Sequence, residues 1–122
     1  METESFQPYI QAWKLRIARR EKARKKRWQL ARREAEALAK KLGKRYGADK
    51  VVLFGSVLDG NRFHEGSDID LAVRGLRPER FFAAWSKLEE ASPFRVDLVT
   101  LESCRTSLKA RILTKGEVLY GG

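Results

Sequence analysis

Apolar side chains recur at steps of three and four along residues 8–42, a spacing that predicts a long amphipathic helix. In the middle of this range, Arg20, Glu21 and Arg24 stand where the stripe would need apolar side chains. We therefore expect two amphipathic parts joined by a charged middle, in one long protruding helix. The second part, about residues 28–42, should pack on the domain, while the first should need a partner surface. The stripe consists of Ile10, Trp13, Ile17, Trp28, Ala31, Ala35, Leu38 and Leu42.

After residue 48 the spacing changes to that of short strands alternating with helices. The runs KVVLFGS, SDIDLAV and FRVDLVT are predicted strands, and EVLY is expected to form a short closing strand. The segments RPERFFAAWSKLEEA and LESCRTSLKARILTKG have helical spacing. This alternation predicts an α/β layer architecture. The expected apolar anchors of the first of these helices are Phe81, Phe82, Trp85 and Leu88.

The positive charge of the chain is concentrated in one segment. Residues 14–33 contain eleven Lys or Arg and a single acid, Glu21, so the rest of the chain holds fifteen basic and fifteen acidic residues. We therefore divide the chain into a basic helical arm over residues 1–43 and a nearly neutral domain over residues 44–122. Such an arm is typical of a partner for nucleic-acid phosphates, acidic proteins or anionic membrane surfaces.

Composition narrows the class of protein further. A length of 122 residues suits one compact domain, and a single cysteine excludes an internal disulfide framework. The N-terminal residues do not have the pattern of a secretory signal, and no apolar run approaches the roughly 18 residues of a membrane-spanning helix. We expect a cytoplasmic protein that does not enter a membrane.

Two carboxylates stand on one face of a predicted strand. Asp68 and Asp70 alternate with apolar residues in SDIDLAV, so their Cα atoms should lie about 7 Å apart. Such a pair needs either cationic side chains or divalent ions, and hard carboxylate oxygens suit Mg²⁺ or Mn²⁺. Asp97 adds a third carboxylate if its strand neighbours this one, and three acids can support two-metal displacement at phosphorus. The local cationic alternatives are Arg62, Arg74 and Arg95.

Gly55 and Ser56 follow the first predicted strand, where the chain must turn. Glycine lets a backbone N–H approach a phosphate, and the serine hydroxyl adds a donor. These residues predict a phosphate-binding turn beside the acids. Ser67, just before the acid pair, is typical of a residue that closes a local turn. His64, the only histidine, is expected on an exposed loop.

The stretch LFGSVLDGNRFHEGSDIDLAV, with RVDLV downstream, resembles the minimal nucleotidyltransferases of the polymerase-beta superfamily. The resemblance covers about residues 48–120 and implies a small mixed sheet with flanking helices, of the α+β type. It implies that Asp68 and Asp70 bind both ions and that Asp97 binds the catalytic ion and helps to activate the acceptor hydroxyl. It also implies that Gly55, Ser56 and Ser67 bind the nucleotide. Val57 departs from the family pattern, which often has a basic or small polar residue directly after Gly-Ser.

The function implied by this resemblance is Mg²⁺-dependent transfer of a nucleoside monophosphate, such as AMP from ATP or another NTP, to a hydroxyl on a protein or nucleic acid. Family members of this size often stand beside a helical HEPN-type partner as the antitoxin of a toxin–antitoxin pair. A different hypothesis is a module that caps a partner, or binds nucleic acid through residues 14–33, without catalysis. A homo-oligomer is a further expectation that the sequence leaves open.

Overall fold

The structure is a computed structural model that describes residues 2–122, with side chains from Gln7 onward. A single sheet of four strands has the order β3-β2-β1-β4. β1 runs antiparallel to both of its neighbours, whereas β2 and β3 are parallel, so the predicted mixed sheet with flanking helices is confirmed. The elements are α1 (Glu2–Tyr46), β1 (Lys50–Phe54), η1 (Gly55–Leu58), β2 (Ile69–Arg74), η2 (Pro78–Arg80), α2 (Phe81–Ala91), β3 (Val96–Thr100), α3 (Thr106–Lys115) and β4 (Glu117–Tyr120).

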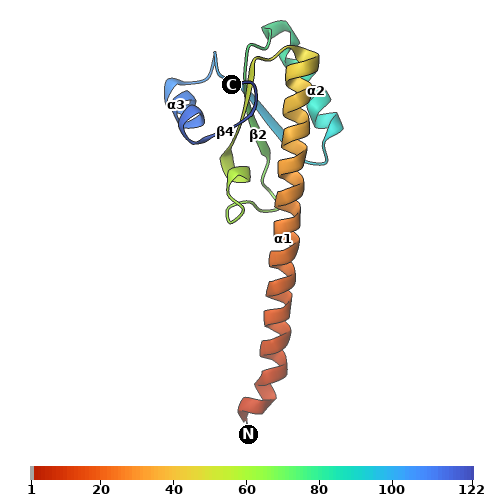
Figure 1. The fold of residues 1–122 in the computed structure, drawn as a ribbon. Coiled ribbons are helices and arrows are strands. Elements are labelled where there is room, and N and C mark those ends of the chain that lie inside the picture. Colours follow the sequence, from red (N-terminus) through yellow and green to blue (C-terminus); the bar gives the residue numbers. More distant parts are fainter. Residues whose placement is uncertain (1) are drawn as a thin grey trace.

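The first helix, α1, is one uninterrupted element that extends far beyond the rest of the molecule (Figure 1). Its C-terminal part carries the predicted apolar stripe into the core, where Ala31, Ala35, Leu38 and Leu42 are buried. Every described side chain from residue 7 to residue 23 is exposed. The predicted protruding helix with a packed second part is therefore confirmed, and we call residues 7–27 the basic arm.

Helix α1 ends at Tyr46, directly before Gly47, because the chain must reverse there. Gly47 has a φ of +78°, a left-handed conformation that glycine adopts without strain. A second glycine, Gly43, lies inside the helix and is buried. A Cβ at residue 43 would overlap the ring of Tyr120, so glycine allows α1 to lie close against β4.

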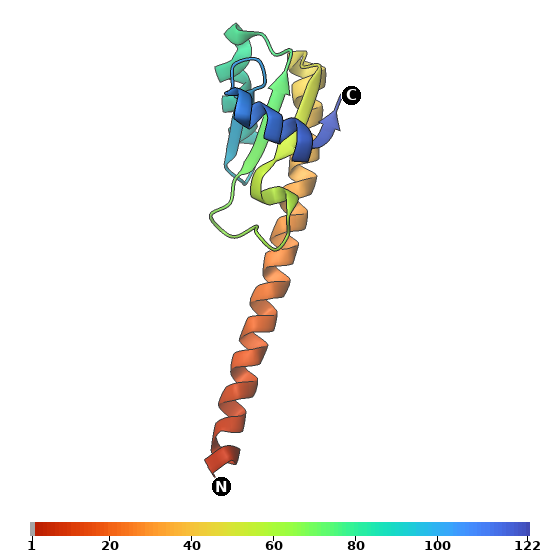
Figure 2. The ribbon, with the colours of Figure 1, turned by 90° about the vertical axis from the view of Figure 1, so that its left-hand side faces the viewer.

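Helices cover both faces of the sheet, unequally. The larger core lies between the sheet and the pair α1 and α2, and alternate strand residues such as Leu53 and Leu71 point into it. The smaller core lies on the opposite face, where Val52 and Ala72 pack against Ile112 of α3. In Figure 2, α3 crosses one face of the sheet while α1 lies behind the other. The α3 helix covers only part of its face of the sheet.

Two details of the helices differ from the sequence-based expectation. Phe82, expected as an anchor of α2, is 75% exposed, and Ala84 is buried at the core position instead. The reason is that Ala84 and Leu88 lie four residues apart on the same side of the helix, whereas Phe82 projects from another side. The last helix begins at Thr106, so Leu101 is buried from the preceding turn and not from the helix.

We expect the two parts of α1 to respond differently to the same substitution. Leu42 is fully buried, so Leu42→Ala should lower the free energy of unfolding by about 2–5 kcal/mol. Leu15 is 51% exposed on the arm, so Leu15→Ala should change it by less than about 0.5 kcal/mol. Urea denaturation followed by circular dichroism measures both. Equal losses would show that the arm is packed in the folded protein.

Candidate functional site

The sheet brings two of the three predicted acids directly together. Asp70 is the second residue of β2 and Asp97 the second residue of β3, and the two are register partners in the parallel pair. Neighbouring strands lie about 4.8 Å apart, and both side chains belong to the face that α3 covers further along. Asp68 precedes β2 by one residue and shares this face by alternation. The expectation that the strand of Asp97 neighbours SDIDLAV is confirmed.

The carboxylate of Asp70 has no positive charge to compensate it. Burial, and then repulsion from Asp97 and Asp68, raises the pKa of Asp70 to about 6. Within the part of the chain whose side chains are described, none of the three acids forms an ion pair or a side-chain hydrogen bond. The arginines considered as structural partners therefore do not neutralise this group.

The donor chemistry of the three acids fits a divalent cation. Carboxylate oxygens are the ligands that Mg²⁺ and Mn²⁺ prefer, and a half-buried acid held among like charges gains most from such an ion. Over the described residues, no group of three or more His, Cys, Asp and Glu side chains already converges closely enough to enclose an ion. The Asp97 side chain is exposed.

Gly55 connects the predicted phosphate-binding turn to the acids. It directly follows Phe54, the register partner of Asp70 across β1 and β2. Its φ is +80°, and a Cβ at residue 55 would overlap a carboxylate oxygen of Asp70. Glycine is therefore required here for two reasons, the left-handed backbone and the approach of the carboxylate.

The turn itself is a single 3-10 turn, η1, which begins at Gly55. Ser56 is half-buried, and its carbonyl accepts the N–H of Asp59. Val57 is fully buried, which explains an apolar residue where related sequences often have a polar one. The side chain at this position serves the core, so any grip on a phosphate comes from the backbone and from Ser56.

A residue of α1 holds this turn in place. The indole N–H of Trp28 donates a hydrogen bond of 2.7 Å to the carbonyl of Val57, and the Trp28 ring lies where a Cβ on Gly60 would sit. Trp28 belongs to the predicted apolar stripe, but the spacing of the stripe does not predict this contact. No sequence signal links residues 29 positions apart in this way.

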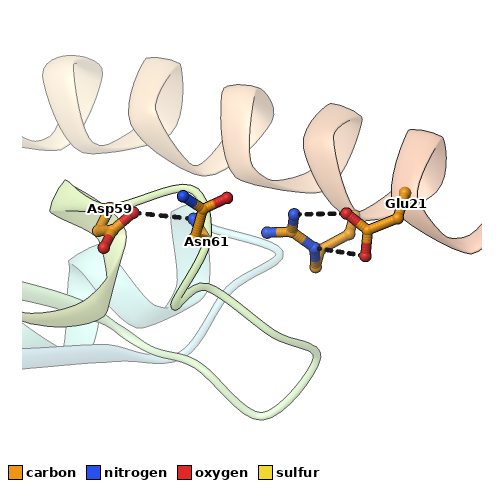
Figure 3. Close-up of polar contacts among 4 residues, drawn as sticks. Glu21, Asp59 and Asn61 are labelled. Carbon is orange, nitrogen blue, oxygen red and sulfur yellow. Dashed lines mark hydrogen bonds and ion pairs between the residues drawn. The ribbon is translucent and has the colours of Figure 1, made fainter.

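The loop after the turn is closed by its own side chains and touched by the arm. Ser67 is buried, and its hydroxyl oxygen accepts the N–H of His64 at 3.0 Å, as expected for a turn residue. Figure 3 shows Asp59 bound to the N–H of Asn61, and Glu21 on the neighbouring helix. Glu21 pairs with Arg24 at 2.8 Å, and this carboxylate raises the pKa of the Arg24 guanidinium.

The strand that carries Asp97, β3, is one of the two edge strands of the sheet. An apolar groove of about 870 Å³ runs along β3, and Asp97, Phe82 and Trp85 are among its lining residues. The indole N–H of Trp85 donates a hydrogen bond of 2.7 Å to the carbonyl of Val96, next to Asp97. Trp85 was expected only as a core residue. The structure shows that it also fixes the backbone beside the acid.

A glycine turn, two acids on neighbouring strands and a third acid directly before β2 agree with the comparison to protein families. Residues 36–122 match the model of the polymerase beta nucleotidyltransferase family, which is more than half of the chain. The chain therefore belongs to this family. No curated protein matches it.

Solved structures place the chain more narrowly. It is 34% identical to a chain of a toxin–antitoxin complex crystallised with AMP-PNP, with a TM-score of 0.62 over 71% of this chain and 73% of that one. It is 28% identical to a chain of the complex of tri-AMPylated Shewanella oneidensis HEPN toxin with MNT antitoxin, with a TM-score of 0.54 over 78% and 73%. Separately, none of the helices described here is long and apolar enough to cross a membrane.

The pKa of Asp70 predicts a pH-dependent stability. The native protein retains a proton on this group up to about pH 6, whereas the unfolded chain releases it near 3.8, so this group's contribution to stability falls as pH rises between these values. Asp70→Asn should therefore raise the free energy of unfolding at pH 7.5 by about 1 kcal/mol, because solvent screens part of the repulsion. The gain should vanish below about pH 4. Urea denaturation across pH without divalent ions measures it.

Titration of the wild type and the Asp70→Asn variant with Mg²⁺ tests whether an ion binds at Asp70. Mg²⁺ should stabilise the wild type at pH 7.5, should stabilise it less at pH 5, and should leave the Asn variant nearly unchanged. Equal stabilisation of both proteins by Mg²⁺ would argue against an ion at Asp70.

The contact between Gly55 and Asp70 predicts that two glycine substitutions lower the free energy of unfolding by different amounts. Gly55→Ala should destabilise more than Gly47→Ala, because both glycines have a positive φ but a Cβ at residue 47 meets no atom within 4 Å. Gly47→Ala should cost about 1 kcal/mol from the backbone alone, and Gly55→Ala about 1–3 kcal/mol more. Adding Asp70→Ala should remove most of the excess. Equal costs in urea denaturation would contradict the contact.

Proposed function

We propose that this protein is a metal-dependent nucleotidyltransferase that moves AMP from ATP to a hydroxyl group on a partner protein. The observation that carries the proposal is the meeting of Asp70 and Asp97 across neighbouring strands, with the backbone of Gly55 against the Asp70 carboxylate. A phosphate-binding turn, an ion-binding acid pair and a third acid at the acceptor side are the parts that such a transfer needs.

Each part has a distinct role in the reaction. The backbone of Gly55 and the hydroxyl of Ser56 hold the triphosphate, and Asp68 and Asp70 hold Mg²⁺ or Mn²⁺. Bound ions supply neutralisation of the charge that develops on the phosphate oxygens. Asp97 is exposed, would complete the binding of the catalytic ion, and helps to take the proton of the incoming hydroxyl, whose oxygen attacks the α-phosphorus. The bond between the α-phosphorus and the bridging oxygen breaks, and pyrophosphate leaves. The role of Ser67 is to fix the loop that carries Asp68, in addition to any contact with the nucleotide.

The acceptor is reached from the β3 edge of the sheet. The apolar groove along β3 has Asp97 among its lining residues, and its volume of about 870 Å³ is in the range of ligand-binding clefts. Chains similar to this one occur in complexes of a toxin with an antitoxin, and in one of these complexes the HEPN toxin is AMPylated. These similarities support the role of an antitoxin that modifies a helical HEPN-type partner.

Asp70→Asn should reduce AMP transfer by about 10²–10³-fold or more, because it removes the acid on which the ion set depends. The assay incubates the protein with Mg²⁺, α-labelled ATP and its HEPN-type partner, and counts the label on the partner. Asp49→Asn is the matched control, since it removes an exposed carboxylate at the opposite end of β1. Its rate should equal that of the wild type.

The same assay distinguishes catalysis from simple capping. If the partner remains unlabelled with each of the four NTPs while it still binds the wild-type protein and the Asn variant equally, the protein acts as a cap. If the Asn variant transfers label at the wild-type rate, Asp70 has been assigned wrongly.

A further inference from the structure

The basic arm is the part of the molecule that the nucleotidyltransferase function does not use. The family match begins at residue 36, so the arm lies outside it. From residue 14 to residue 27 the arm has nine Lys or Arg and one acid, Glu21, which is already paired with Arg24. All of these cations except Arg24 are exposed. Like charges on neighbouring helix turns repel, so an arm of this composition is stabilised when a polyanion binds it.

The charge density of this segment matches a nucleic acid. Fourteen helical residues span roughly 21 Å, so the net charge of this segment corresponds to about one positive charge per 2.6 Å. Duplex nucleic acid carries about one negative charge per 1.7 Å of its axis. We propose that residues 14–27 of α1 form a binding surface for the phosphodiester backbone of nucleic acid.

The distribution of the cations favours this partner over a lipid surface. With 3.6 residues per turn, the nine cations point to all sides of the helix, so no apolar face is separated from a charged one along this segment. A helix that lies on a bilayer needs such a separation. A second copy of the chain is also a poor partner, because the residues outside 14–33 have no net negative charge. The partner that fits these observations is a polyanion that wraps around the helix or runs along it.

The surface also lies near the candidate site. Figures 1 and 2 show the arm leaving the domain at the end where η1 and the following loop lie. Arg27 reaches this loop, since its guanidinium lies 3.5 Å from the carbonyl of Glu65 and 4.8 Å from the centre of the Phe94 ring. A nucleic acid bound along the arm is therefore held beside the loop that leads into Asp68.

Fluorescence anisotropy with a labelled 20-nucleotide RNA, the DNA of the same sequence and its duplex tests the proposal between 50 and 300 mM salt, without nucleotide or Mg²⁺. If about six cations contact phosphates, the logarithm of the affinity should fall with the logarithm of salt with a slope of about −4 on single strands. The quadruple variant Arg16→Gln, Arg19→Gln, Arg20→Gln and Lys22→Gln keeps residues of good helix propensity. It should lose at least tenfold in affinity at the lowest salt and about three units of slope.

The matched control removes four exposed cations from the domain, Arg74, Arg77, Lys109 and Arg111, each replaced by Gln. It has the same net charge as the arm variant and should bind nearly as the wild type does. Equal losses in both variants, or a flat salt response, would overturn the proposal. So would binding of anionic phospholipid vesicles or polyglutamate as tightly as nucleic acid. The relative affinities for the RNA and for the DNA identify which nucleic acid is preferred. Since no nucleotide is present, the result does not depend on whether AMP is transferred.

Discussion

The structure depends on one unfavourable contact, the half-buried carboxylate of Asp70 held against the Gly55 backbone and opposite Asp97. Burial and repulsion raise the pKa of Asp70 to about 6, so the ionised group opposes folding near neutral pH. A sheet selected only for stability would place an apolar residue here, as it does two positions along at Ala72. The parallel pairing of β2 with β3 and the positive φ of Gly55 both serve to bring polar groups together at this point.

The helix α1 links this site to the rest of the chain. Its C-terminal part is a core element that packs on β1 and β4, and its middle holds the turn η1 through Trp28. The same rigid element then continues as the basic arm. A ligand proposed for the arm and a phosphate proposed for the turn would therefore both contact one helix, with Arg24 and Trp28 less than two helical turns apart. This continuity gives a physical route by which a bound partner can affect the turn.

Much of this arrangement follows from the sequence, because it is encoded locally. The spacing of apolar residues in α1 and the alternation in SDIDLAV each depend on one element, and both expectations are confirmed. The features that the sequence did not predict concern how one helix or strand contacts another. The exposure of Phe82 depends on which side of α2 meets the sheet, and the bond from Trp28 to Val57 depends on where a distant turn lies. The sharing of ions by three acids remains a prediction. So do the roles of the individual site residues, which are Asp68, Asp70, Asp97, Gly55, Ser56 and Ser67.

The separation of charge between arm and domain restricts what the arm can do for catalysis. At physiological salt the field of an exposed charge is screened over about 8 Å. The packed part of α1, from Trp28 onward, covers the face of the sheet opposite α3, whereas the three acids lie on the α3 face. Most of the arm's cations lie on the exposed part of α1 that extends beyond the domain (Figure 1). In the proposed function, the affinity for a triphosphate would then come from the turn, the acids and their ions. The arm can bind a longer anion that extends past the edge of the domain. Its cations therefore affect which partner the protein binds more than they affect the affinity for a nucleotide.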